Sequence, residues 1–387
     1  DTLALAGLVE ELRAIAAGDP DAKTRAMGSY QQAVAMDPKN ILALQWLASI
    51  YLDIRQPVKA REGFEKVVEL DPLNTLALSG LANAYFALGL YDEARNHLFR
   101  LQSLFSDLGM IYRYLSFIEY QSGRIDKSIF WQERAIAAEP EPLMLYFTSS
   151  SYTSIGWADE ALAAAEKYRQ SSDGVDISRL VQAQLDRNFD LITVESTAVF
   201  KQTGESDLAV LSAWAEAIAG RCAASIPVLE NQYPSLKGEI IEYMDNDDLL
   251  DAVLLAHCNA ETGNATESGR LTRALLTSDL LSDEALRAAP GLKLVRIAAQ
   301  AVAGNKRAAL EDLAGIDIKT VPLAISKIGL PIDELPVYES LFEESVFRNY
   351  ATQERYQISQ QARMLASGET EKEIIAQVKA AGYTLHE

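Results

Sequence analysis

Residues 41–74 read ILALQWLASIYLDIRQPVKAREGFEKVVELDPLN, and elements of this pattern return along the first 170 residues with a period of 34. Residues one or two periods apart are Ala26, Ala60 and Ala94; Pro38, Pro72 and Pro140; and Tyr51 and Tyr85. A fixed period of this length is typical of stacked units, each burying its apolar face only against its neighbours. We therefore expect an array of stacked units rather than one globular core of 387 residues.

The residue types within one unit indicate two antiparallel helices. Ala48 and Ala60 are small where two helices must approach to about 8–10 Å, while Tyr51 and Phe64 are large enough to fill the space under the next pair. Pro72 has no amide hydrogen and disfavours a helical residue before it, so it ends the pair. The order of small, large and helix-breaking residues predicts an all-α fold.

The unit resembles the tetratricopeptide repeat in Leu44, Leu47, Ala48 and Tyr51, then Ala60 and Phe64, then Pro72. In that family a bulky residue, a Leu-Gly-like pair and a Tyr occupy the first helix, Ala and Phe the second, and Pro closes the unit. The usual Trp and Gly are replaced here by Leu44 and Ala48. Units 75–108 and 109–142 repeat the pattern with substitutions, a fifth unit follows, and the first shows only its second half. The resemblance covers about residues 7–170 and implies a right-handed α-solenoid.

Beyond Ser171 the period fades, but helix pairs continue. Gly220, Gly263 and Gly304 lie 43 and 41 residues apart, each after an Ala-rich helix and before an amphipathic one. We interpret these pairs as degenerate repeats that continue the solenoid, and a separate helical domain is the alternative. The expected division is a repeat array at 1–174, degenerate pairs at 175–320, and a connection with C-terminal capping helices at 321–387.

The last part of the chain contains breakers and then returns to helix. Three prolines after Ala314 predict an extended connection: Pro322, Pro331 and Pro336. Apolar residues at helical spacing predict a helix over Glu339–Ala366. Thr370 with Glu373 predicts a capping box that opens a last short helix, which Gly382 closes. We expect this terminal helix to cover the open apolar end of the array.

Charge and hydropathy exclude some classes of partner. The formal net charge is -20 and the pI about 4.7, whereas nucleic acids and anionic membranes attract clustered Lys and Arg. We interpret the acidic excess as solubility of a long surface, with a docking face for a basic partner as the alternative. No stretch reaches the ~18 apolar residues of a membrane span, and the start lacks Met and a basic signal region, as expected of an excised or processed soluble piece. The compartment, cytoplasm or periplasm, is left open.

The side chains of an enzyme or a metal site do not occur in a recognisable arrangement. The sequence has no Gly-rich phosphate loop ending in Gly-Lys, no Gly-x-Ser-x-Gly and no His-Glu-x-x-His. The three histidines, which form no ligand pair, are His97, His257 and His386. An acidic cluster lacks the glycine of a calcium loop and predicts a solvated helix start: Glu239, Glu242, Asp245, Asp247, Asp248 and Asp251. We expect no enzyme, no metal and no cofactor.

Two further features bear on the compartment. Cys222 and Cys258 are too few for a disulfide framework, and we interpret both as small buried apolar residues. A single bridge between neighbouring repeats is the alternative, which leaves the redox compartment open. The tripeptide at 264–266, Asn-Ala-Thr, matches a glycosylation sequon and matters only in a secreted chain.

The resemblance implies a binding groove, because first helices in this family line a concave face that holds partner segments. The first-helix residues not needed for packing are Gln45, Trp46, Ser49, Asp53, Ser79, Asn83, Phe86, Arg113, Tyr114, Phe117, Tyr120, Tyr146 and Ser150. Aromatic and Arg anchors contribute about 2 kcal/mol or more each at interfaces. Alternatively, Tyr114, Phe117 and Tyr146 pack under a neighbouring turn, or the chain's own C-terminal helix fills the groove. Only Asn83 and Arg113 suit a clamp for a terminal carboxylate, so we do not expect one.

These observations predict a non-catalytic scaffold that binds a protein or peptide along the groove. The layout, with a leader helix before the repeats and decayed pairs after them, also loosely resembles regulatory halves that follow winged-helix or nucleotide-cyclase domains in bacterial signalling proteins. A regulatory region of a larger signalling protein is therefore the alternative function. Pairing of two copies through the terminal repeats is a further prediction.

Overall fold

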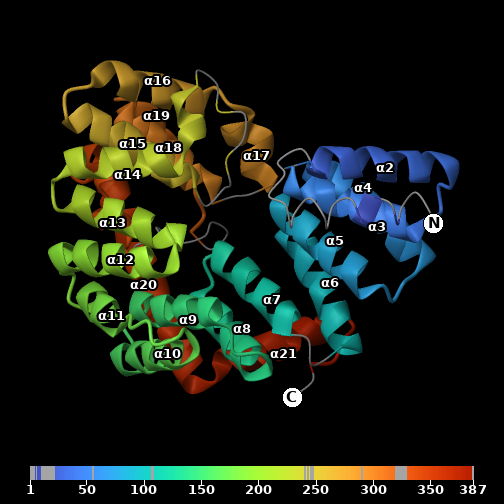
Figure 1. Ribbon diagram of the computed structural model, residues 1–387. Helices are drawn as coiled ribbons and strands as arrows, with labels where there is room; N and C mark the ends of the chain where they lie inside the picture. Colours follow the sequence, from blue (N-terminus) through green and yellow to red (C-terminus); the bar gives the residue numbers. More distant parts are fainter. Residues whose placement is uncertain are drawn as a thin grey trace. The chain divides into compact units, whose positions relative to one another are not determined.

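The computed structural model describes residues 5, 7–9, 22–54, 56–105, 109–238, 241, 244, 248–288, 291–318 and 329–385, and the regular structure among them is helical (Figure 1). The chain divides into two compact units, unit 1 at 1–114 with 377–387 and unit 2 at 115–376. The two unit boundaries fall within helices, at 114/115 and at 376/377, and the predicted domain boundaries at 174 and 320 stay predictions. None of the described helices is both long enough and apolar enough to cross a bilayer.

The helices of the two units follow one another in pairs. Unit 1 holds α2 (Ala22–Met36), α3 (Ile41–Asp53), α4 (Pro57–Leu70), α5 (Thr75–Ala87), α6 (Tyr91–Leu104) and the first part of α7 (Gly109–Gln121). Unit 2 continues with α8 (Ile125–Ala138), α9 (Pro142–Ser154), α10 (Ala158–Ser171), α11 (Ser178–Leu185), α12 (Phe189–Thr203), α13 (Ser206–Ile218), α14 (Cys222–Gln232), α15 (Leu249–Glu261), α16 (Ala265–Leu276), α17 (Asp283–Ala288), α18 (Leu292–Val302), α19 (Lys306–Ala314), α20 (Ser345–Ser367) and most of α21 (Glu369–Ala380). Four short 3-10 helices of unit 2 are η1 (Pro234–Lys237), η2 (Asp279–Leu281), η3 (Ile332–Glu334) and η4 (Pro336–Leu341).

The repeats that begin with α3 and α5 start with the same cap. Asn40 and Asn74, which are 34 residues apart, accept hydrogen bonds from the backbone amides of Ala43 and Ala77 at 3.0 and 2.9 Å. Such a bond satisfies one of the amides that a helix leaves unpaired at its start. The Asp-Pro turn therefore ends one pair and leads to the cap of the next.

Close packing between the helices of unit 1 depends on glycine as well as alanine. A Cβ atom at Gly63 in α4 would lie 2.8 Å from the Cβ of Ala48 in α3, and one at Gly80 would overlap the ring of Phe64. Phe64 and Ala60 are fully buried, as the sequence pattern predicts for the small and large positions. The sequence reasoning missed both glycines, which occupy positions that the family pattern does not specify.

A left-handed residue marks the turn between the two helices of most pairs. Gly89, Gly123, Gly156, Gly220, Gly263 and Gly304 have φ between +69° and +84°, and Arg187 takes the same role at +53°. The pairs predicted around the last three glycines are confirmed as α13 with α14, α15 with α16, and α18 with α19. The buried apolar side chains of unit 2 form one cluster from Ile125 in α8 to Ala351 in α20. The predicted all-α solenoid of antiparallel pairs is thus confirmed.

The C-terminal helices differ from the prediction in detail. The helix expected from Glu339 begins at Ser345, because η4 occupies the preceding residues. Thr370 is the second residue of α21 and not its cap, and the predicted capping box is wrong. The Thr370 hydroxyl donates instead to Asp126 of α8 at 2.7 Å, a contact across 244 residues that the local pattern could not reveal.

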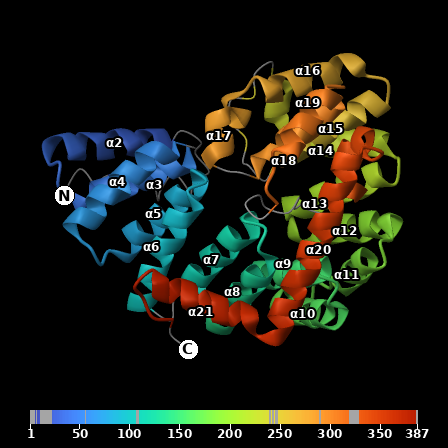
Figure 2. The same ribbon diagram turned by 180° about the vertical axis from the view of Figure 1, so that it is seen from behind.

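The same helices tie the first pair of unit 2 to its last pair. The amide of Gln361 in α20 accepts from the Ile125 backbone nitrogen at 2.7 Å and donates to the Gly123 carbonyl at 2.8 Å. The other end of α20 packs on α19, and Lys306 of α19 pairs with Glu344 at 2.6 Å. Figure 2, the view from behind, shows α20 and α21 in red.

Candidate binding face

The turn residue defines a common register for the first helix of each pair. Residues ten and six positions before it lie four apart, so they share one side of the helix. We name the surface formed by these positions the first-helix face of a unit. In unit 1 it contains Gln45, Ser49, Ser79, Asn83 and Arg113, and in unit 2 it contains Phe117, Tyr146, Ser150, Ile177, Val181, Val210, Trp214, Val253, His257, Leu294 and Ala298.

The first-helix face of unit 1 is polar, and one exposed apolar residue, Leu76, lies next to it on α5. Ser79 donates its hydroxyl to the Thr75 carbonyl at 2.8 Å, and Ser49 donates to the Gln45 carbonyl at 3.1 Å, so both hydroxyls are satisfied within their own helices. Asn83 is half-buried, and Leu76 on the same side of α5 is 59% exposed. Sequence reasoning omitted Leu76, although its spacing to the two polar residues is helical.

Aromatic residues flank this face in unit 1. Phe86 is half-buried, with its ring 5.7 Å from that of Tyr91. Trp46 packs against the apolar cluster of α2 and α3, and its ring nitrogen is shielded from solvent without a hydrogen-bond partner among the described residues. Burial raises the pKa of the Tyr114 hydroxyl. Asp53 is exposed and Arg113 half-buried, so few charges lie on these helices.

The four remaining predicted groove residues belong to unit 2 and are half-buried: Phe117, Tyr120, Tyr146 and Ser150. Phe147, which the sequence reasoning missed, joins two of them. Its ring lies 5.6 Å from Phe117 in an edge-on arrangement and 5.7 Å from Tyr146. The Ser150 carbonyl accepts a hydrogen bond from Ser154 at 3.0 Å. The structure therefore gathers Phe117, Tyr146 and Phe147 into one cluster.

From α11 onward the first-helix face is apolar and buried. The residues ten positions before the turn are Ile177, Val210, Val253 and Leu294, and those six positions before it are Val181, Trp214, His257 and Ala298. Each is at most 8% exposed. The signal was in the sequence, because counting back from Gly220, Gly263 and Gly304 gives these residues directly.

A segment of the chain packs on the part of this face that α15 and α18 contribute. We name Gly329–Leu341, which includes η3 and η4, the strap. Its η4 packs against α15 and α18, where the Tyr338 hydroxyl donates to the Leu294 carbonyl at 2.9 Å and Ser340 donates to the Ala301 carbonyl at 3.4 Å. The η4 part of the strap packs on other helices than those that carry Tyr114, Phe117 and Tyr146, so the alternative of a self-filled groove at these residues stays a prediction.

Comparison with known families identifies the repeats. Models described as tetratricopeptide repeat match residues 29–62 and 55–107. Residues 29–107 carry tetratricopeptide repeats. No curated protein matches the chain.

Comparison with solved structures finds matches to parts of the chain. MamA is 26% identical over 42% of this chain and 93% of its own, with a TM-score of 0.37. A thermophilic TPR protein of Thermus thermophilus is 22% identical over 48% of this chain and 97% of its own, with a TM-score of 0.38. PilF of Pseudomonas aeruginosa is 15% identical over 53% of this chain and 94% of its own, with a TM-score of 0.43.

The acidic cluster and the cysteines of the repeat protein correct two interpretations. Asp251 is fully buried and not solvated, since it accepts from the Trp214 ring nitrogen at 2.7 Å and from the Tyr233 hydroxyl at 2.6 Å. Four of the other acidic residues, Glu239, Glu242, Asp245 and Asp247, lie outside the described residues. Cys222 and Cys258 are buried, as expected, but they form a disulfide between α14 and α15, with their Cα atoms 4.7 Å apart.

The histidines have structural surroundings. The His97 ring nitrogen lies 2.9 Å from the Leu78 carbonyl, and burial lowers its pKa to about 4. Burial also lowers the pKa of His257, against the opposing effects of Glu261 and Glu339. The third histidine, His386, lies outside the described residues. Within the described part of the chain, no group of three His, Cys, Asp or Glu side chains could hold a metal ion.

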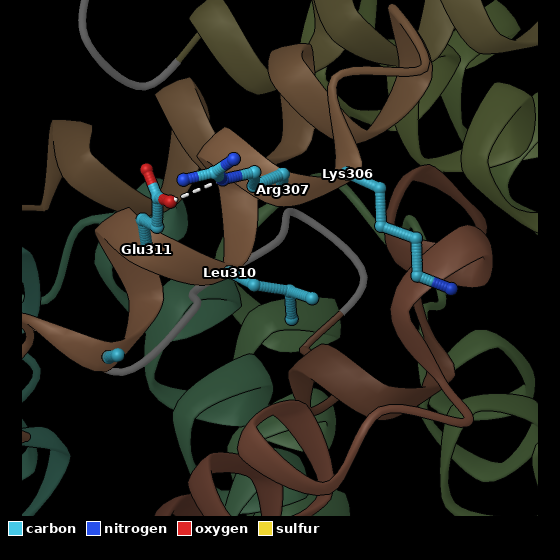
Figure 3. A pocket seen from close by; sticks show the side chains of 5 residues that line it. Lys306, Arg307, Leu310 and Glu311 are labelled. Atoms are coloured by element: carbon cyan, nitrogen blue, oxygen red, sulfur yellow. Dashed lines mark hydrogen bonds and ion pairs between the residues drawn. The ribbon is translucent and has the colours of Figure 1, made fainter.

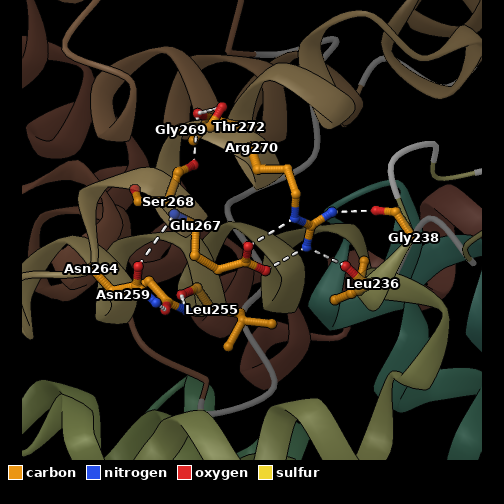
Figure 4. A network of polar contacts seen from close by, with 10 residues as sticks. All are labelled: Leu236, Gly238, Leu255, Asn259, Asn264, Glu267, Ser268, Gly269, Arg270 and Thr272. Carbon is orange, nitrogen blue, oxygen red and sulfur yellow. Dashed lines mark hydrogen bonds and ion pairs between the residues drawn. The ribbon is translucent and has the colours of Figure 1, made fainter.

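Two other surface features of unit 2 are occupied or shallow. Arg270 binds Glu267 and the carbonyls of Leu236 and Gly238, and so anchors η1 to α16 (Figure 4). Asn264 of the sequon donates to Asn259 at 3.0 Å and caps α16. An open depression of about 500 Å³ lies over α19, lined by Lys306, Arg307, Leu310, Glu311 and Ala314 (Figure 3).

Proposed function

We propose that the protein is a non-catalytic scaffold that holds a segment of a protein partner on the first-helix face of unit 1. Tetratricopeptide repeats are generally protein-interaction modules. The observation that supports this placement is the exposure of Leu76 beside half-buried Asn83 and Phe86. The positions of α13, α15 and α18 that are equivalent to Asn83 hold Trp214, His257 and Ala298, and all three are buried.

The chemistry of this face favours an extended segment with apolar anchors. Leu76 and Phe86 offer apolar contact area, and Asn83 offers both a donor and an acceptor to a peptide backbone. Buried aromatic anchors contribute about 2 kcal/mol or more at interfaces. Arg113 supplies a cation, but the lysines of a carboxylate clamp are absent from this face. The partner is therefore recognised along its chain and not by its terminal carboxylate.

Two exposed leucines of unit 1 make a matched test. Peptides selected from a random library for binding the wild-type chain are titrated against Leu76→Asp and Leu73→Asp variants, since Leu73 is 60% exposed and lies in the turn before α5. We expect the first variant to lose at least tenfold in affinity, because it places a charge at an apolar anchor. The second should bind like the wild type. Equal affinities for all three chains would place the binding surface elsewhere.

A regulatory role within a larger signalling protein remains the second prediction, and so does pairing of two copies through the terminal repeats. Sedimentation equilibrium of the chain tests the second of these. A concentration-independent monomer mass would rule out the pairing.

A further inference from the structure

We propose that the strap is a built-in peptide ligand of unit 2, and that the face under it accepts a competing partner segment of the same pattern. This pattern is an adjacent pair of acidic residues, Asp333 and Glu334 in the strap, with a proline and apolar residues on either side. The inference rests on the proposed function, in which first-helix faces hold extended segments. It assigns a binding site that lies on unit 2 and that the chain itself occupies.

Apolar anchors hold the strap in place. Ile332, Leu335, Tyr338 and Leu341 are fully buried, and Val337 is nearly so. They belong to the same buried cluster as the first-helix residues of α13, α15 and α18. Strap and face therefore share one core, in the way that an anchored peptide shares a core with its groove.

The backbone of the strap is satisfied as that of a bound peptide must be. The Ile332 amide donates to the carboxylate of Glu354, which α20 presents fully buried, at 2.8 Å. Pro331 and Pro336 have no amide to satisfy, so the apolar surroundings leave no donor unpaired at these positions. A partner segment with prolines at the same places would meet the same requirement.

Two of the three acidic residues of the strap, Asp333 and Glu334, meet two arginines. Arg355 binds Asp333 at 2.8 Å and Glu334 at 2.7 Å. Arg187, at the turn between α11 and α12, also pairs with Glu334. This charge complementarity selects an acidic segment and sets its direction along the face. It also excludes the basic partner that the overall acidity of the chain would suggest.

Competition in trans tests the proposal. A labelled peptide with the sequence of residues 329–341 is titrated against the full chain and against a full-chain Tyr338→Ala variant, with fluorescence anisotropy as the readout. The variant strap has lost its largest anchor, so we expect the wild-type peptide to displace it and to bind the variant at least tenfold more tightly than the wild-type chain. A peptide that carries the same Tyr338→Ala change should not gain.

The control is Tyr356→Ala, which removes an exposed tyrosine of α20. It should bind the peptide as weakly as the wild type does. If the Tyr338→Ala chain binds the peptide no better than the wild type, or binds both peptides equally, the strap is ordinary core and the proposal fails.

A second measurement covers the case in which Tyr338→Ala does not fold. Hydrogen exchange of the strap amides is compared in Arg355→Ala and Arg169→Ala, because Arg169 forms a similar exposed pair with Glu166 on α10. We expect about fivefold faster exchange only in the first variant. Equal exchange rates in the two variants would show that the ion pairs of Arg355 do not hold the strap. These experiments leave Leu76 untouched, so they fail or succeed independently of binding to unit 1.

Discussion

The first-helix faces of unit 1 and unit 2 occupy the same register but carry opposite chemistry. At ten positions before the turn, α5 has Ser79 and α13 has Val210; at six positions before it, they have Asn83 and Trp214. The pairs α5–α6 and α13–α14 both turn at a left-handed glycine, Gly89 and Gly220. The comparison teaches that the repeat pattern specifies the stack, whereas a few side chains per pair decide whether its face is covered.

Removing the main strap anchor should give the largest effect on this contrast. Tyr338→Ala deletes a fully buried ring and its hydrogen bond to the Leu294 carbonyl. We expect a loss of about 3–5 kcal/mol in the unfolding free energy of unit 2. Urea denaturation measures it, with Tyr356→Ala as the exposed control, expected within about 0.5 kcal/mol of wild type. A loss as small as the control's would contradict the anchoring role.

Reducing the disulfide should be the next largest effect. The bridge closes a loop between residues 36 apart, so its loss should lower the stability of unit 2 by about 2–4 kcal/mol. Thermal unfolding of the chain with and without a thiol reductant, and of the Cys222→Ser, Cys258→Ser double variant, measures it. Unit 1 holds neither cysteine, so its transition should not move. A reductant effect of equal size in the double variant would disprove the bridge.

Acid should weaken unit 1 through His97. Its pKa is about 4 when folded, below the ordinary value of 6.5, so the unfolded chain binds more protons between these values. Stability is therefore complete above pH 6.5 and falls by about 2–3 kcal/mol as the pH drops toward 4. Denaturation curves at several pH values, with His97→Gln as the comparison, test this. The variant should lose the slope in this window, and an unchanged slope would assign it to other groups.

Exchanging one position between the units should give the smallest effect. Val210→Ser removes fully buried methyl groups from the covered face, and we expect a loss of about 1–2 kcal/mol. The reverse change, Ser79→Val, removes a buried hydroxyl that bonds only to carbonyls of its own helix, and we expect it to cost less than about 1 kcal/mol. Equal costs measured by urea denaturation would mean that the two faces are equally covered.

Much of the fold could be predicted, because period and breakers are local signals. The pairs from α3 to α6 follow from residues 34 apart, and the decayed pairs follow from glycines after Ala-rich helices. Contacts between distant segments could not be predicted in this way. Thr370 and Glu373 match a capping box, yet they bond to α8 because tertiary contacts outweigh a local cap.

The candidate face was only partly predictable. The family resemblance placed residues on the first helices. It could not tell which hydroxyls donate to the backbone of their own helix, as that of Ser79 does. No periodic pattern in the sequence indicates the surface on which the strap packs, because its prolines predict only an extended connection. The apolar positions of α13, α15 and α18 were the available clue that something covers them.

The length of helix α20 limits how far apart the first and last pairs of unit 2 can lie. Its 23 residues span about 34 Å and are anchored at α19 near one end and at α8 near the other. An open solenoid can extend elastically, and it can grow by duplication of a helix pair. In unit 2 an added pair would break the contact of α20 with either α19 or α8. The length of α20 therefore sets the number of pairs that unit 2 can contain.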